Sequence, residues 1–242
     1  MNTLSSMSFL RVFLLLLTAC LFSSCREKTI TTYQDPIQKE SNPKKEVVVK
    51  KTLEQSTKPI SALLDPLKLA TLRSDRAANS RFNKIMYHIN RLTLEYDCKA
   101  SKVIDSIYSH LPQNACYNGT QVYCPSIAKT NLTAQHRYAT ALGLFDTEYN
   151  LMKLKKGGSP IIQKGKYIGK ITHVDHLIPR DVAPELENSF MNLTFLSSTE
   201  NLKKSNKLTN GGLRRIQSLM KAGIGWKPSQ ELQARIDATK VK

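Results

Sequence analysis

The segment that decides the fold is His173-Val174-Asp175-His176-Leu177-Ile178-Pro179-Arg180, followed by Asn192-Leu193 and then by Asn201-Leu202-Lys203-Lys204-Ser205-Asn206-Lys207. Residues 160–176 alternate short apolar runs with glycine, which predicts two extended segments that turn around Lys164-Gly165-Lys166. A brief apolar strand or turn at 192–196 follows, and a short helix begins at Ser198 with Ser or Thr as its cap. The expected fold is therefore α+β, with Asp175 and His176 at the end of a strand.

With this spacing, the three pieces resemble the HNH nuclease motif of the ββα-metal fold. The resemblance is close from His173 to Lys207 and looser from Ala139 to Gly223, and it leaves the N-terminal half uncovered. The third motif position holds Asn201 in place of histidine, which is similar to the HNH domain of the RNA-guided CRISPR nucleases. The resemblance implies an HNH core embedded in a mostly helical domain.

The resemblance also implies a role for each motif residue in phosphodiester hydrolysis. His176 would be the general base that activates water, and Asn192 would orient the His176 ring. Asp175 and Asn201 would hold a divalent cation from the strand end and the helix. Because both ligands are oxygens and one is neutral, Mg²⁺ or Mn²⁺ is expected rather than zinc.

The neighbouring polar residues leave alternatives open. By the two-residue period of a strand, His173 lies on the same face as Asp175, either as a group behind the metal ligands or as an edge histidine with no role. Basic residues around the motif would grip backbone phosphates without reading sequence, or they would form a solvated basic surface. These basic residues are Arg180, Lys203, Lys204 and Lys207.

The charge of the whole chain favours polyanionic partners. Lys and Arg number 36 against 19 Asp and Glu, which gives a formal charge of +17 over 242 residues. Such a surface attracts nucleic acid or anionic lipid through screened long-range forces, although solubility alone would also explain it. We expect nucleic acid, DNA in particular, as the partner, and no obligate protein partner.

The N-terminus predicts export. Arg11 precedes an apolar run at 12–22 that is the length of a signal-peptide core and short for a membrane span. Leu17-Thr18-Ala19-Cys20 resembles the bacterial lipobox, so Cys20 is the expected lipidation site, and Cys25 is a poorer second candidate. A cleaved signal without lipid is the alternative. The lipidated protein would be anchored to the cell envelope on its periplasmic or surface side.

The remaining cysteines predict a disulfide. With Cys20 lipidated, four cysteines remain, and Cys116 and Cys124 flank a turn-like segment that would let them form a bridge. A zinc ribbon is disfavoured because the chain has no paired Cys-x-x-Cys.

The expected domain order is a signal peptide at 1–19, a flexible tether at 20–59, a helical region at 60–130 and an HNH nuclease domain at 131–242. Apolar stripes predict core-facing helices around 82–92 and 103–111, another helical segment at 133–156, and helices near 213–220 and after Pro228. His88, His110 and His136 belong to these helices and are interpreted as packed or solvated side chains.

Three functions compete. The first is a metal-dependent endonuclease that acts on DNA with little base specificity. The second is a degenerate HNH lipoprotein that binds nucleic acid or a protein partner without cutting, suggested by the basic excess and the missing third histidine. The third is a structural lipoprotein of the envelope, which rests only on the anchor and the helical middle.

Overall fold

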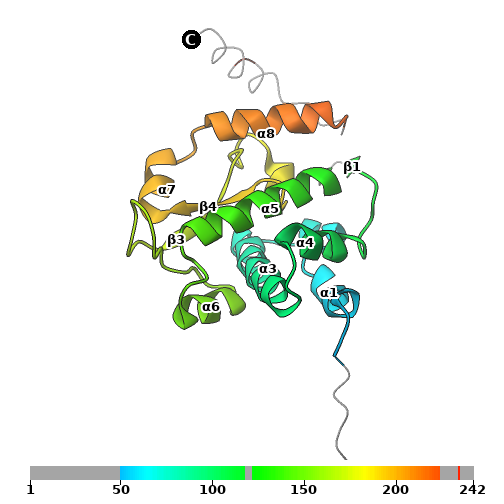
Figure 1. Cartoon of the computed structure of the whole chain (residues 1–242). Coiled ribbons are helices and arrows are strands. Elements are labelled where there is room, and N and C mark those ends of the chain that lie inside the picture. The colour runs from blue at the N-terminus through cyan, green and yellow to red at the C-terminus, as the bar shows by residue number, and fades with distance from the viewer. Residues whose placement is uncertain (1–49, 118–121, 224–233, 235–242) are drawn as a thin grey trace, which may run out of the picture. The chain divides into compact units, whose positions relative to one another are not determined.

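The computed structural model describes residues 50–117, 122–223 and 234. Helices surround two small antiparallel sheets, so the predicted mixture of helix and strand is confirmed (Figure 1). The elements, in chain order, are α1 Leu53–Ser61, α2 Pro66–Ala70, α3 Asp75–Glu95, α4 Ala100–Tyr108, β1 Cys116–Tyr117, β2 Val122–Tyr123, α5 Pro125–Ala141, α6 Glu148–Lys155, β3 Thr172–His176, the 3-10 turn η1 Pro184–Leu186, β4 Leu193–Ser197, α7 Ser198–Lys204 and α8 Asn210–Lys221.

The folded part begins before the expected end of the tether. Thr52 caps α1, because its hydroxyl accepts from the N–H of Gln55 while the Gln55 side chain accepts from the N–H of Thr52. Residues 53–61 are therefore helical, whereas the tether was predicted to run to residue 59. The signal peptide, Cys20, Cys25 and most of the tether lie outside the described residues.

The long helix α3 is the centre of the core. Its apolar residues at three- and four-residue spacing are fully buried, as the sequence pattern predicts. They are Phe82, Ile85, Met86, Ile89 and Leu92. The predicted stripe of α4 is buried as well, so the helical middle is a packed scaffold.

The helical region and the C-terminal part share one core. The ring of Phe82 on α3 meets Phe195 on β4 edge-on at 5.2 Å and Phe190 at 5.6 Å between centroids. The described residues from 50 to 223 belong to one compact unit. The boundary predicted between residues 130 and 131 falls inside α5 and separates no domains, because a helix that packs on both sides cannot be divided there.

The central sheet is a β-hairpin-like pair that leads directly into a helix. β3 and β4 run antiparallel, with Asp175 opposite Thr194 and His176 opposite Leu193, and α7 begins at the end of β4. The first predicted extended segment, at 160–163, does not form a named strand, but it lies antiparallel to residues 169–172 through a bridge between Ile161 and Ile171 and a hydrogen bond from the N–H of Thr172 to the carbonyl of Pro160, and the chain turns at 164–169. Gly165 and Gly169 have φ of 85° and 80°, a turn conformation that a strand does not adopt.

Helix α5 holds the sheet by side-chain amides. The Asn131 Nδ2 donates to the carbonyls of Phe190 and Leu193 at 2.7 and 2.9 Å, and the Gln135 Oε1 accepts from the N–H of Phe195 at 3.0 Å. These bonds satisfy backbone groups of β4 and of the segment just before it, where no other strand supplies partners. The small sheet is thereby fixed on a helical support.

The predicted Cys116–Cys124 disulfide is absent from the structure. Cys124 is a buried free thiol, and its Sγ lies 3.2 Å from the Oγ of Ser126. The register of β1 and β2 explains this, because it places Tyr123 rather than Cys124 across from Cys116.

The last described helix, α8, buries Ile216 and Leu219, as its amphipathic pattern predicts. The further helix predicted after Pro228 lies outside the described residues. Within residues 50–117 and 122–223, none of the helices combines the length and the apolar character needed to cross a membrane.

Candidate active site

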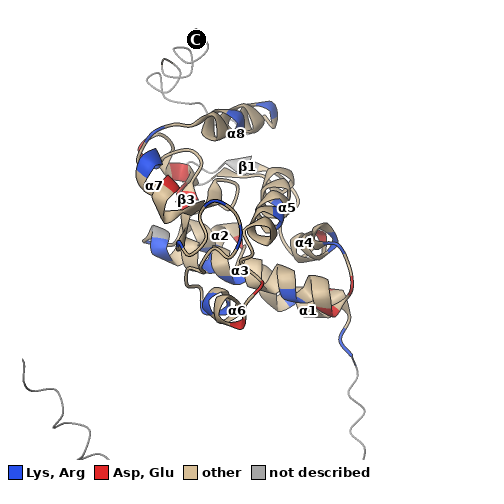
Figure 2. Cartoon of the chain, turned by 60° about the vertical axis from the view of Figure 1, so that its left-hand side comes forward, with Lys and Arg blue, Asp and Glu red and all other residues tan. Residues whose placement is uncertain are grey.

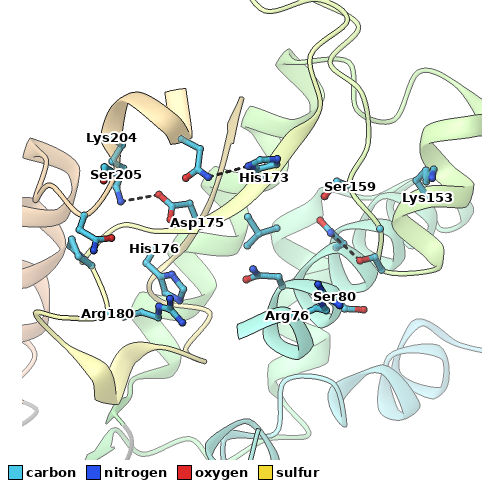
Figure 3. Close-up of a pocket in the computed structure, with 18 of the residues that line it drawn as sticks. Arg76, Ser80, Lys153, Ser159, His173, Asp175, His176, Arg180, Lys204 and Ser205 are labelled. Atoms are coloured by element: carbon cyan, nitrogen blue, oxygen red, sulfur yellow. Dashed lines mark hydrogen bonds and ion pairs between the residues drawn. The ribbon is translucent and has the colours of Figure 1, made fainter. Parts of the chain in front are cut away.

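A pocket of about 800 Å³ opens where the end of β3 meets α7, α3 and the loop after α6 (Figure 3). His173, Asp175 and His176 line it from β3, and Asn201 and Lys204 line it from α7. Three of the four predicted catalytic and metal-binding residues are therefore brought together. The fourth, Asn192, is buried behind the pocket.

The ring of His176 is held by a backbone carbonyl. Its Nε2 lies 2.8 Å from the carbonyl oxygen of Glu187. Because a carbonyl oxygen only accepts, the Nε2 must carry the proton and donate, which leaves Nδ1 as the basic nitrogen of the neutral ring. His176 is 6% exposed, so this bond fixes the orientation of the ring.

Asn192 does not orient His176, contrary to the sequence-based interpretation. Its Oδ1 accepts from the N–H of Ile178 at 2.7 Å, and its Nδ2 donates to the carbonyl of Ile178 at 2.9 Å. The Asn192 carbonyl also accepts from the N–H of Leu177 at 2.7 Å. Asn192 therefore clamps the chain immediately after His176, and it acts on the backbone rather than on the imidazole.

Asp175 faces a lysine of α7. The Nζ of Lys204 lies 2.8 Å from the Asp175 Oδ2, and the two side chains are 9% and 19% exposed. Among the described residues, the Lys204 ammonium is the only polar partner of that buried Oδ2. In Figure 3 the dashed line between these two residues spans the gap from β3 to α7.

His173 supports Asn201. The Asn201 Nδ2 donates to the His173 Nδ1 at 3.0 Å, which leaves the amide Oδ1 of Asn201 as its acceptor. Between the two alternatives for His173, the structure favours a group that holds a motif residue. His173 and Asp175 are two residues apart on β3, so both reach toward α7.

The start of α7 is fixed by a capping box. The Ser197 Oγ accepts from the N–H of Glu200 at 3.1 Å, while the Glu200 carboxylate accepts from the N–H of Ser197 at 3.1 Å. Asn201 and Lys204 follow three residues apart and share a helix face. Local sequence thus sets where α7 starts and which of its side chains share a face, and the pairing of β4 with β3 brings that face to β3.

The predicted phosphate-binding residues divide into two groups. Arg180 and Lys204 line the pocket, and Arg180 also donates to Glu187 at 3.2 Å. Lys203 and Lys207 are exposed and do not line it. Three further basic residues, which the sequence motif does not include, also line the pocket: Arg76, Lys153 and Lys156. Arg76 begins a polar stripe, with Asn79, Ser80 and Asn83, on the face of α3 away from the buried apolar residues, and that stripe was the available signal. Figure 2 shows where the basic and acidic side chains lie along the helices and strands.

The oxygen atoms of the pocket supply some of the ligands that a hard divalent cation needs. Asp175 supplies a carboxylate, whose Oδ2 is paired with the Lys204 ammonium, and Asn201 supplies a side-chain amide in the same pocket. In the described part of the chain, no group of three or more His, Cys, Asp or Glu side chains is arranged to hold a metal ion. A cation here would therefore keep several water or substrate ligands, which is the usual behaviour of Mg²⁺.

Comparison with known proteins gives no relative. No protein-family model, no curated protein and no solved structure matches the chain.

Proposed function

We propose that the chain is a metal-dependent endonuclease of the HNH kind, which hydrolyses phosphodiester bonds of DNA with little sequence specificity. The observation that carries the proposal is the convergence of Asp175, His176 and Asn201 on one basic pocket. Further support is the local order of strand, strand and helix, which is the order that the resemblance to the ββα-metal fold implies.

His176 is the proposed general base. With Nε2 donating to the Glu187 carbonyl, Nδ1 can take a proton from water as the water attacks phosphorus. A positioned base of this type contributes about 10² to 10⁴ in rate. The ring does not have to change its tautomer before it acts, because the backbone bond already selects it.

Asp175 and Asn201 are the proposed ligands of Mg²⁺ or Mn²⁺. When bound, such an ion supplies charge neutralisation on the phosphate and on the departing oxygen. His173 keeps Asn201 in place, since it accepts from the amide nitrogen and leaves the amide oxygen for the cation. Lys204 must give up its contact with the Asp175 Oδ2 if that oxygen is to bind the metal.

Arg180 and Lys204 are the residues near the motif that we propose contact the phosphates. Both line the pocket, and neither side chain reads a base when it binds a phosphate oxygen. This accounts for the expected lack of sequence specificity. Lys203 and Lys207 can add only long-range attraction from the exposed surface.

We further propose that the enzyme is exported and anchored to the cell envelope through a lipid on Cys20. The support is the apolar run at 12–22 and the lipobox-like residues before Cys20. DNA that reaches the envelope would then be the substrate.

The direct test is incubation of the purified protein with plasmid DNA and Mg²⁺ or Mn²⁺, with and without a chelator. Cleavage should require the metal, and His176→Ala should lower the rate by about 10² or more. His110→Ala is the matched control, because His110 bonds to Thr57 in the helical scaffold and does not line the pocket. If His176→Ala cuts as fast as the parent, His176 is not the base.

A second candidate is a degenerate HNH protein that binds nucleic acid or a partner protein without cutting. The contact of Lys204 with Asp175 favours it, because an ammonium group takes the place beside the carboxylate. This candidate requires salt-sensitive DNA binding that is independent of metal. Cleavage that a chelator abolishes would contradict it.

A further inference from the structure

One side of the pocket is built by residues outside the motif. Arg76, Asn79, Ser80 and Asn83 of α3 line it, and their spacing places all four on one face of the helix. The opposite face, which includes Phe82, is buried in the core. This polar face is therefore held rigidly, because the core fixes the helix that carries it.

The loop after α6 completes this side. The Asn83 Nδ2 donates to the carbonyl of Gly157 at 3.2 Å, which ties the loop to α3. Gly157 has φ of 82°, and a Cβ there would lie 2.0 Å from the Oγ of Ser80. Only glycine allows this close approach. The surface formed by α3 and the loop is named here the α3–α6 wall, and it comprises Arg76, Asn79, Ser80, Asn83, Lys153 and residues 156–159.

The α3–α6 wall is basic and carries no acidic residue. Arg76, Lys153 and Lys156 belong to it, and none of the three forms an ion pair with a carboxylate of the described residues. Lys153 lies over the ring of Tyr149 at 5.3 Å, a contact that brings no negative charge to it. Figure 3 shows Arg76 and Lys153 on the side of the pocket away from Asp175 and Lys204. Uncompensated cations on this side attract an anionic strand.

The wall also presents acceptors without partners. Asn83 is 2% exposed and its Oδ1 accepts no hydrogen bond, and the Oδ1 of Asn79 is likewise buried and unpaired. Buried polar atoms usually have partners, so each of these two oxygens can still accept a hydrogen bond from a bound molecule. A nucleic acid supplies anionic phosphates for the cations and N–H or O–H donors of bases and sugars for the amides. An inorganic polyanion supplies only the first.

We propose that the α3–α6 wall binds the nucleic-acid strand through both its phosphates and its nucleosides, beside the phosphodiester bond that Asp175, His176 and Asn201 act on. The inference rests on the proposed function for the identity of the ligand, and it adds the helical region to the substrate site. Arg76, Lys153 and Lys156 take the phosphates, and the amide of Asn79 accepts from a base or sugar donor.

The test measures binding in the presence of a chelator, so that it does not depend on cleavage. A short fluorescein-labelled DNA strand, and the same sequence as a duplex, are titrated with the full chain by fluorescence anisotropy over a series of salt concentrations. The triple variant Arg76→Gln, Lys153→Gln, Lys156→Gln should make the slope of log K against log salt shallower by about 2 to 3, because each lost phosphate contact removes nearly one counterion.

The matched control removes the same charge elsewhere. Lys58, Lys99 and Lys102 are exposed on α1 and at the start of α4 and do not line the pocket. Their triple Gln variant should keep the parental slope. Equal losses in the two triple variants, or an unchanged slope in the wall variant, would overturn the proposal.

Asn79→Ala separates the nucleoside contact from the phosphate contacts. It should weaken binding of the strand several-fold with the salt slope unchanged, while polyphosphate competes equally well against the parent and the variant. Equal strand affinity of Asn79→Ala and the parent would overturn the nucleoside part. A parent that binds as described and never cuts would contradict the proposed endonuclease and leave the wall proposal standing.

Discussion

The Nζ of Lys204 lies 2.8 Å from the Oδ2 of Asp175, so the motif carboxylate is paired with a cation of its own chain. Lys204 stands one helical turn after Asn201 and on the same face, which means that any ion held by Asp175 and Asn201 has to compete with this ammonium group. The pair therefore decides both how tightly the site holds a metal and whether Asp175 is available to it.

Removal of this competitor should tighten metal binding. Lys204→Met keeps the length of the side chain and removes its charge, so we expect Mn²⁺ to bind about three- to tenfold more tightly, equivalent to roughly 0.7–1.4 kcal/mol. Electron paramagnetic resonance of free Mn²⁺ during a titration measures the dissociation constant without reference to activity.

Lys203→Met is the control, because its exposed side chain on the same helix does not touch Asp175. It should change Mn²⁺ affinity little. An equal dissociation constant for the parent and Lys204→Met would show that Lys204 does not compete with the ion.

The hydrogen bonds of Asn192 to the backbone of Ile178 should contribute strongly to the free energy of unfolding. Asn192→Ala leaves the buried N–H and carbonyl of Ile178 without partners, which should cost about 2–5 kcal/mol of unfolding free energy in urea. Asn206→Ala breaks an exposed bond to Asp181 and should cost below about 1 kcal/mol. Similar losses in the two variants would argue against the clamp.

The geometry of His176 predicts one tautomer. Nitrogen-15 NMR of the imidazole should show the neutral ring protonated at Nε2, because the Glu187 carbonyl accepts from that atom. Glu187→Gln should leave the tautomer unchanged, since it keeps the backbone carbonyl. A ring protonated at Nδ1 would remove Nδ1 from its role as base.

The local pieces of the fold could be predicted because each has a short-range signal. The buried stripe of α3, the strand that ends at His176 and the helix that starts at Ser198 all follow from residue period and capping. The same signals bring Asp175, His176 and Asn201 to neighbouring ends of elements. Their convergence depends on β3 pairing with β4, which the linear pattern suggests but does not require.

The remainder depends on contacts between distant segments. Arg76 reaches the pocket because Phe82 packs on Phe195, more than a hundred residues later, and no local pattern carries that information. The role of Asn192 was assigned to the wrong partner for the same reason, since its target is the backbone of a loop. The prediction of a Cys116–Cys124 disulfide was wrong because the β1–β2 register pairs Cys116 with Tyr123, and the length of the intervening turn does not determine that register.

Acid should destabilise the fold through His136. Burial lowers the pKa of this histidine below its ordinary value of 6.5, and its Nε2 has no partner. The unfolded chain therefore binds the proton more readily, so the stabilising contribution is complete above about pH 6.5 and is lost as the pH falls through the lower folded pKa. His136→Phe keeps a ring against Phe145 and removes the titration.

The measurement is the melting temperature of both proteins at about pH 7.5 and about pH 5.5. The parent should lose more between these two values than His136→Phe. Other groups titrate equally in the two proteins. Among them is His88, because burial and the nearby charge of Arg91 lower the pKa of His88 in both. Equal losses would show that His136 does not carry the acid sensitivity.

Two glycines with the same backbone conformation provide a test of how tightly α3 and the α6 loop are packed. Gly157 and Gly165 have φ of 82° and 85°, but a Cβ at Gly157 would lie 2.0 Å from the Ser80 Oγ, whereas nothing lies within 4 Å at Gly165. Gly165→Ala should therefore cost only the strain of the left-handed conformation, about 1 kcal/mol. Gly157→Ala adds overpacking and should cost about 2–4 kcal/mol in urea unfolding.

A double-mutant cycle assigns the difference to Ser80. Ser80→Ala removes the Oγ nearest to the added Cβ, so the double variant Ser80→Ala, Gly157→Ala should recover part of the loss, with a coupling energy of about 0.5 kcal/mol or more. Two cations of the α3–α6 wall depend on this packing, because Lys156 directly precedes Gly157 and Lys153 lies four residues before it. Additive losses, or equal costs at Gly157 and Gly165, would mean that the loop is free to move away from α3 and that the wall is not a fixed surface.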